Sequence, residues 1–142
     1  HELHVLDDDT WVAACGFGAF RTSDGGGSWT RLDEGFEQGY CRSAFEYAGD
    51  VYVGAATSPS GNWNEPEEEP ACYVSRDGGE FEVVETPRPD EVVTGMTSVD
   101  GTLYAGTHRG SIMRRSVDGW TVVGAVPTPG AVGGRYTPLA SF

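Results

Sequence analysis

Short apolar runs recur along the chain, and most of them end at Gly, Asp or Pro. None shows the three-to-four-residue spacing of an amphipathic helix, whereas Val, Thr, Tyr, Phe and Trp, which suit a pleated and half-buried surface, are plentiful. The 21 glycines among 142 residues fit frequent tight turns. The pattern therefore predicts an all-β protein built from short strands.

The apolar runs divide into three groups of four expected strands, followed by one more. The first group is Leu3–Leu6, Trp11–Cys15, Ala19–Thr22 and Trp29–Leu32. The second is Cys41–Tyr47, Val51–Ala56, Cys72–Ser75 and Phe81–Glu85. The third is Val93–Ser98, Thr102–Thr107, Ser111–Arg115 and Trp120–Gly124, and Tyr136–Phe142 follows it.

Two landmarks repeat along these groups. A turn with Asp or Asp-Gly opens an apolar strand at Asp9, Asp50 and Asp100, which lie 41 and 50 residues apart. A Ser/Thr-x-Asp turn that leads to an aromatic residue comes later in each group. A polar insertion, Ser58–Pro70, lengthens the second group. A unit of about 40 residues with four strands is typical of a β-propeller blade.

The expected architecture is therefore a single partial β-propeller of four-stranded antiparallel blades over residues 1–142. The expected blades are 1–38, 39–89 and 90–126, and 127–142 starts a fourth blade or closes the third. Three blades and one strand leave edges and one blade face open, so we expect closure by further blades of the same chain or by a homo-oligomer. A generic β-sandwich is the alternative.

The later turn resembles the Asp box, or BNR repeat, of sialidases, sortilin-type receptors, some glucanases and photosystem-assembly propellers. Its first copy matches the full pattern, its second has the aromatic one position early, and its third is shortened. The matching residues are Thr22, Asp24, Gly26, Ser28 and Trp29, then Ser75, Asp77, Gly79 and Phe81, then Ser116, Asp118 and Trp120. The resemblance implies that these residues support the fold at the periphery, away from a ligand site.

The chemistry of the turn is structural. A short carboxylate at a tight reversal can accept backbone N–H groups, and glycine permits the positive φ values that such a turn needs. We expect the aromatic residue to turn inward and pack between neighbouring blades. No dense acidic loop accompanies the turns, so no metal is assigned to them.

The charge is strongly negative, at −13, from 22 acids and nine bases. All nine bases are Arg, and Lys is absent from the sequence. An acidic chain without Lys is typical of a protein that stays soluble in concentrated salt, which indicates a halophile; a GC-rich genome is the alternative. Such a surface repels phosphate backbones, so nucleic acid is not expected as a partner.

The three cysteines, Cys15, Cys41 and Cys72, are interpreted as small buried hydrophobic residues. A disulfide between Cys15 and Cys41 is the alternative. No signal peptide or membrane-crossing apolar run is recognisable, which favours the cytoplasm, although His1 need not be the native start.

A ligand site is expected where loops gather around the propeller axis. Arg supplies a fork for a carboxylate, and an exposed Trp supplies a flat face for a sugar ring. The candidates are Tyr40, Arg42, Trp63, His108 and Arg109. The alternatives are an Arg paired with nearby acids, a solvated loop histidine, and a Trp that anchors its own loop.

Two functions remain open from the sequence. The first is a non-catalytic propeller module that binds a protein or a glycan, or serves as a scaffold. The second is a glycoside hydrolase of the sialidase or glucanase kind, for which no catalytic residue is assigned, because spacing alone pairs no carboxylates among 22 acids. No cofactor is expected.

Overall fold

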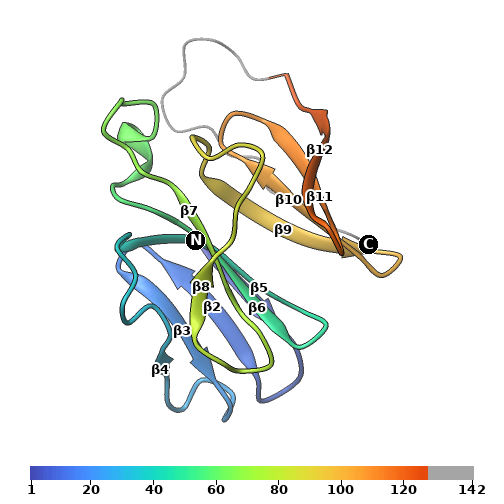
Figure 1. The fold of residues 1–142 in the computed structure, drawn as a ribbon. Helices are drawn as coiled ribbons and strands as arrows, with labels where there is room; N and C mark the ends of the chain where they lie inside the picture. Colours follow the sequence, from blue (N-terminus) through green and yellow to red (C-terminus); the bar gives the residue numbers. More distant parts are fainter. Residues whose placement is uncertain (128–142) are drawn as a thin grey trace.

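The computed structural model describes residues 1–127, which form three four-stranded antiparallel sheets (Figure 1). The first sheet consists of β1 (Glu2–Val5), β2 (Trp11–Cys15), β3 (Gly18–Thr22) and β4 (Thr30–Arg31). The second consists of β5 (Tyr40–Tyr47), β6 (Asp50–Ala56), β7 (Ala71–Ser75) and β8 (Phe81–Val83). The third consists of β9 (Val93–Val99), β10 (Thr102–Thr107), β11 (Ser111–Ser116) and β12 (Gly119–Ala125).

Strands follow one another in chain order across each sheet, and the only helical element among the described residues is the 3₁₀ turn η1 (Ser60–Asn62). The all-β prediction and its division into three four-stranded units are confirmed. The strand expected at Tyr136–Phe142 lies outside the described residues.

Two hairpins show why the strands reverse where they do. Tyr47 pairs with Asp50 and Val99 pairs with Thr102, so Ala48-Gly49 and Asp100-Gly101 are two-residue loops. Their φ angles are 53° and 87° in the first loop and 48° and 70° in the second. Two positive φ values define a type I′ turn, whose twist matches that of the strands it joins, and Asp-Gly is a preferred sequence for it.

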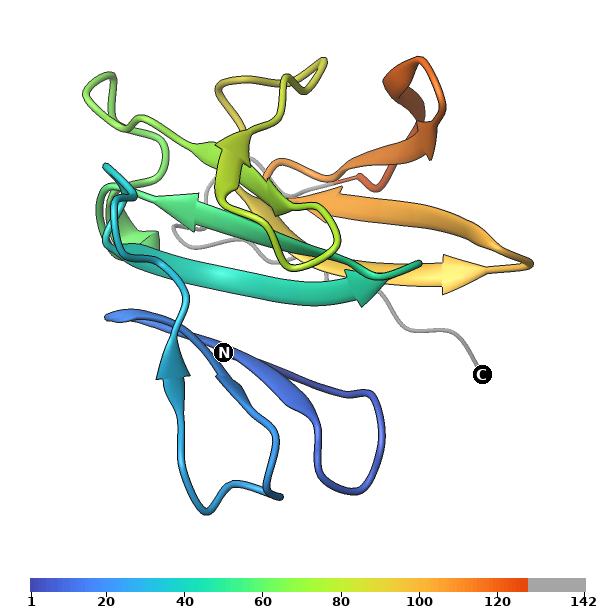
Figure 2. The same ribbon diagram turned by 60° about the horizontal axis from the view of Figure 1, so that its bottom comes forward.

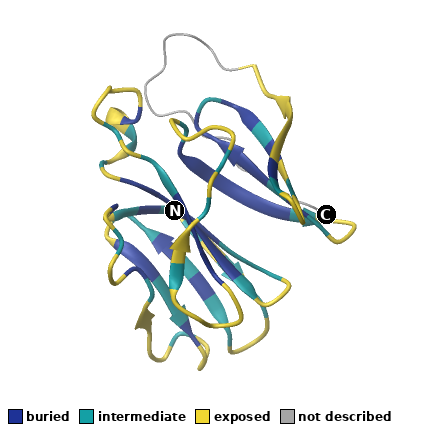
Figure 3. Ribbon diagram, in the orientation of Figure 1, coloured by how far each residue is buried: buried dark blue, intermediate teal, exposed yellow. Residues whose placement is uncertain are grey.

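The apolar core lies between the sheets. Val12, Ala14 and Ala19 of the first sheet pack against Cys41, Val53 and Ala55 of the second. On its other face the second sheet packs Tyr52, Cys72 and Val74 against residues of the third that include Met96, Leu103 and Met113. Each inner sheet face is therefore covered by a neighbouring sheet, and Figures 2 and 3 show the stacked sheets and the buried strands between them.

Gly54 marks a close approach of the second and third sheets. A Cβ atom there would lie 2.4 Å from the Val93 carbonyl oxygen and 2.5 Å from Ser43 Oγ. Ser43 Oγ instead donates a hydrogen bond of 2.9 Å to that same carbonyl. A side chain at position 54 would therefore push β9 away from the second sheet.

The cysteines are free, and none is paired in the structure. Cys41 and Cys72 are buried, and burial raises the pKa of each thiol to about 12. Their interpretation as small core residues therefore holds, whereas the alternative Cys15–Cys41 disulfide is absent. A thiol that stays protonated at neutral pH is a poor nucleophile.

Candidate functional site

Loops of the second and third sheets come together at one end of the structure. The insertion between β6 and β7, the linker from β8 to β9 and the loop between β10 and β11 lie side by side in the upper part of Figure 1. Antiparallel order places these loops together, because β6 and β10 end where β7, β9 and β11 begin. We call this end the loop face.

Trp63 fastens the insertion to the sheets. Its side chain is 1% exposed and contacts Ala56 and Val92, and its Nε1–H donates a hydrogen bond of 2.8 Å to the Ser58 carbonyl. Its ring meets Tyr40 edge-on at a centroid distance of 6.0 Å. The prediction of an exposed Trp63 is wrong, because the indole finds both an apolar niche and a partner for its N–H. Of the two roles open from the sequence, anchoring its own loop is the one observed.

His108 is also buried, at 1% exposure, so the alternative of a solvated loop histidine is wrong. Its Nδ1 accepts a hydrogen bond of 2.9 Å from the Val92 amide, which places the proton of the neutral ring on Nε2. Burial lowers the pKa of His108, and the neighbouring Arg109 lowers it further. His108 is therefore a neutral packing residue whose ring lies 5.6 Å from that of Trp63.

Arg109 connects three segments of the loop face. Its guanidinium forms an ion pair with Asp90 of the linker and lies 3.4 Å from the Asn64 side-chain oxygen of the insertion. The pairing with Asp90 matches the alternative in which an Arg of this acidic chain pairs with a nearby acid. Tyr40, Trp63, His108 and Arg109 are thus brought together at this end.

The fifth candidate, Arg42, lies at a β-bulge of β5, and its positive charge opposes the effect of burial on the pKa of Glu2. Glu2 is a residue that the sequence did not single out. Burial raises the pKa of Glu2 to about 7, while the Ala44 and Met96 amides and Arg42 oppose that rise. Glu2 Oε2 accepts a hydrogen bond of 3.0 Å from the Ala44 amide. This carboxyl group therefore links the first strands of all three sheets. An acid within an apolar strand was the only available signal.

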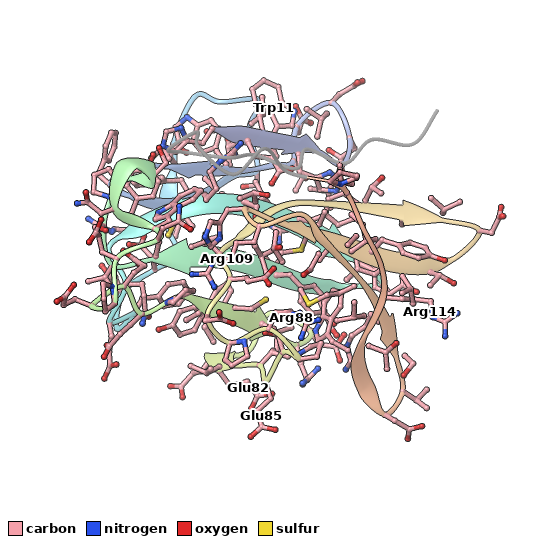
Figure 4. All side chains as sticks on the ribbon, turned by 90° about the horizontal axis from the view of Figure 1, so that it is seen from above. Trp11, Glu82, Glu85, Arg88, Arg109 and Arg114 are labelled. Atoms are coloured by element: carbon pink, nitrogen blue, oxygen red, sulfur yellow. The ribbon has the colours of Figure 1, made fainter. Side chains whose placement is uncertain are left out.

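A cavity of about 360 Å³ opens beside the linker, and the sequence analysis missed it. Its walls come from the end of the insertion, from β7 and β8, from the linker and from β9. Most of the lining is apolar: Pro70, Ala71, Cys72, Val83, Val84, Pro89 and Val93. Glu85 and Glu91 line it as well, and Glu85 is exposed. Figure 4 labels Glu82, Glu85 and Arg88 around this edge of the second sheet.

A second hollow, of about 380 Å³, lies within the insertion and is lined by Glu65, Glu67 and Glu68 together with polar residues. Glu68 accepts a hydrogen bond of 2.6 Å from the Thr57 amide and is also hydrogen-bonded to the Ser58 hydroxyl.

Within residues 1–127, no group of three or more His, Cys, Asp or Glu side chains is arranged to hold a metal ion. In the same range no helix has the length and apolar character needed to cross a bilayer.

The first acidic turn, Thr22 to Trp29, has a dense polar network. Asp24 accepts hydrogen bonds from the Ser28 amide at 2.8 Å, from the Ser28 hydroxyl at 2.7 Å and from the Thr22 hydroxyl at 2.7 Å. Thr22 Oγ1 in turn accepts the Gly26 amide at 3.0 Å. These bonds lower the pKa of Asp24 to about 2, the Ser28 amide contributing most.

The second and third acidic turns use other contacts. Asp77 adopts a φ of 48°, and its amide donates to Asp50 Oδ1 at 3.3 Å. The Ser75 hydroxyl donates to the Gly79 carbonyl at 2.6 Å, and the Ser116 hydroxyl donates to the Gly119 carbonyl at 3.2 Å. A hydroxyl-to-carbonyl bond thus replaces the carboxylate network of the first turn.

The aromatic residues of the three turns differ in burial. Trp120 is 7% exposed and meets Tyr52 of the second sheet edge-on, and Phe81 packs against Phe36 of the linker that follows the first sheet. Trp29 is 43% exposed and lies against Trp11 at 6.3 Å. The prediction that the aromatic packs between neighbouring blades is wrong for Trp29, because no described sheet covers its side of the first sheet.

No protein-family model matches the chain, and no curated protein matches it. Among solved structures, it is similar to a chain described as YCF48 bound to D1 peptide, with a TM-score of 0.60 and 16% sequence identity. The chain has a β-propeller-type fold. The match covers 85% of this chain and 38% of that chain, so the sequence spans well under half the length of this structural neighbour.

Proposed function

We propose that this chain is a non-catalytic β-propeller module that binds an extended protein segment on its loop face. The observation that carries the proposal is the apolar cavity of about 360 Å³ beside the linker. That volume suits one or two apolar side chains. The structural neighbour, described as bound to a peptide, supports a protein partner for a fold of this kind.

The surroundings of the cavity indicate the kind of segment. β8 is the edge strand of the second sheet, so an extended segment can pair with its free backbone groups. Val83 of this strand is 63% exposed and lines the cavity. Glu85 is exposed nearby and attracts basic residues, whereas Glu82 is paired with Arg76. The proposed ligand therefore alternates apolar and basic side chains.

A titration tests this proposal. A fluorescein-labelled peptide of alternating Val and Arg should bind with an anisotropy change, whereas the matching peptide of Val and Glu should not. Val83→Lys should weaken binding at least tenfold, because it puts a charge at the cavity and repels Arg. Val117→Lys is the matched control, since Val117 is 96% exposed in the turn between β11 and β12 of the third sheet. Equal binding of both peptides, or equal affinity of both variants, would contradict the proposal.

We propose that the acidic turns serve as Asp boxes, as their resemblance to that motif implies. The hydrogen bonds of Asp24 support this role most directly. In this role Asp24, Asp77 and Asp118 stabilise the fold rather than act on a ligand. Trp63 and His108 are proposed to shape the loop face from within, because neither is exposed enough to stack on a sugar ring.

High-salt surroundings are proposed from the charge of −13 and the absence of Lys. Mutual repulsion among 22 acids should lower the unfolding midpoint as salt is diluted below about molar concentration. Thermal unfolding followed by circular dichroism over a dilution series measures this. A midpoint that does not move with salt would count against a high-salt origin.

A further inference from the structure

The edge strand β8 has different surroundings on its two sides. Phe81 packs against the core between the first and second sheets, and Val84, just after the strand, packs against the core between the second and third. Because side chains of a strand alternate, Val83 shares the side of Phe81. The Val84 amide donates to the Cys72 carbonyl at 2.7 Å, so the backbone groups of Val83 point away from β7. A segment that pairs with β8 therefore has one row of side chains beside Val83 and the other beside Val84.

The row beside Val84 meets the cavity. The cavity wall includes Val84, Glu91 of the linker and Val93 of β9, so the cavity extends toward the third sheet. Among the described residues that line it, only Glu85 and Glu91 are charged. Glu91 forms an ion pair with Arg88, whereas Glu85 has no ion pair within residues 1–127. The cavity therefore combines mostly apolar walls with one negative charge that no described Arg neutralises.

Glu91 is held in place from the third sheet. Its side chain is 9% exposed, and its Oε2 accepts a hydrogen bond from the Thr107 hydroxyl. Thr107 Oγ1 in turn accepts a hydrogen bond of 3.0 Å from the Ser111 amide. Arg88 Nε lies 3.7 Å from Glu91 Oε1, which is beyond hydrogen-bond distance. Glu91 therefore has a fixed orientation and one oxygen that can accept a further donor.

This carboxylate decides which kind of side chain suits the cavity. An apolar side chain and a long basic one both fit a volume of about 360 Å³. The apolar one would exclude water from Glu91 Oε1 and leave that oxygen without a partner, which is costly. The basic one supplies the missing donor, and its methylene groups can lie along the apolar walls.

We propose, on the basis of the proposed function, that the cavity holds an Arg or Lys side chain of the bound segment, with its charged group on Glu91. The apolar residues of the segment then lie in the other row, beside Val83, which is 63% exposed. Glu91 thus determines specificity for a basic residue. It also fixes the register of the segment, because a shift by one residue would exchange the two rows.

Fluorescence anisotropy in molar salt tests the role of Glu91, because long-range attraction to the acidic chain is screened there and a close, partly buried ion pair is screened much less. The probes are the labelled peptide of alternating Val and Arg and the same peptide with citrulline, which has nearly the shape of Arg but no charge. Glu91→Gln should weaken binding of the Arg peptide at least tenfold and leave the weaker binding of the citrulline peptide unchanged. Glu80→Gln, at an exposed residue of the turn between β7 and β8, removes the same charge outside the cavity and should bind both peptides as the parent chain does.

The design separates this proposal from the proposed function and from a folding defect. Failure of the parent chain to bind the Arg peptide would overturn both proposals. If Val83→Lys weakens binding of the Arg peptide and Glu91→Gln does not, the segment binds at β8 without a basic side chain on Glu91, and only the present proposal is lost. Gln at position 91 can still accept the Thr107 hydroxyl, so circular dichroism should show an unchanged unfolding midpoint. Equal weakening of both peptides by Glu91→Gln would indicate a structural effect and would overturn the specificity role.

Discussion

The first and third acidic turns each show a different feature of the same motif: the first has the hydrogen-bond network, and the third has the buried aromatic residue. The first has the complete hydrogen-bond network around Asp24, but its Trp29 is 43% exposed. In the third, the Ser116 hydroxyl donates to the Gly119 carbonyl, and no hydrogen bond to the Asp118 carboxylate is present among the described residues, yet its Trp120 is 7% exposed. Polar order in the turn and burial of the aromatic are therefore separate properties.

The two properties differ because the hydrogen bonds depend on nearby residues in the chain, whereas burial of the aromatic residue depends on another sheet. The hydrogen bonds of Asp24 join residues within four positions of it, so the local sequence is sufficient to form them. The burial of Trp120 depends on Tyr52, which belongs to another sheet. Trp29 lies on the side of the first sheet that no described sheet covers, where Trp11 is its aromatic contact. An aromatic residue at this position is buried only where a neighbouring blade is present.

The largest effect should come from the two tryptophans. Trp120→Ala should lower the free energy of unfolding by ~3–5 kcal/mol, because it leaves a cavity between the second and third sheets. Trp29→Ala should cost less than ~1 kcal/mol, because its ring is nearly half exposed. Urea unfolding in molar salt measures both. Equal losses from the two substitutions would show that turn type, rather than coverage by a neighbouring sheet, decides the contribution of the aromatic.

The same distinction explains which features could be predicted from the sequence. Strands and hairpins depend on neighbours along the chain, so short apolar runs and the Asp100-Gly101 dipeptide were sufficient to locate them. The expected strand Trp29–Leu32 is shortened to Thr30–Arg31 in the structure, with only the Leu32 amide continuing the pairing toward Ala19. Such an end effect lies below the precision of a sequence pattern.

The loop face depends on contacts that are distant in the sequence. Trp63 is buried against Val92, and His108 accepts a hydrogen bond from the Val92 amide, so the polar composition of the insertion gave a false indication that Trp63 is exposed. The apolar cavity likewise requires β7, the linker and β9 together. Glu2 is a similar case, since only the folded sheets supply its amide partners. Residue type suggested which side chains gather at this end, but not which of them face solvent.

The smallest effect is a dependence on pH that belongs to the first turn alone. The pKa of Asp24 is lowered to about 2 from an ordinary value of 3.8, so the folded state holds a proton there less tightly than the unfolded state does. The resulting stabilisation is fully present above pH 3.8 and is lost as pH falls from 3.8 toward 2. Asp24 is exposed, so solvent keeps the contribution modest.

Substitution of the two aspartates by asparagine isolates this contribution. Asp24→Asn should lower the urea midpoint at pH 6 and should make the decline between pH 4 and pH 2 shallower, because the titrating group is gone. Asp118→Asn should leave both the midpoint and the slope unchanged, because that carboxylate takes no hydrogen bond among the described residues. Salt is held constant, so that all other carboxylates titrate alike in the two variants. If the urea midpoints of both variants and of the parent chain fell with pH in parallel, the network around Asp24 would not stabilise the turn in solution. The two turns would then differ only in the position of their tryptophans.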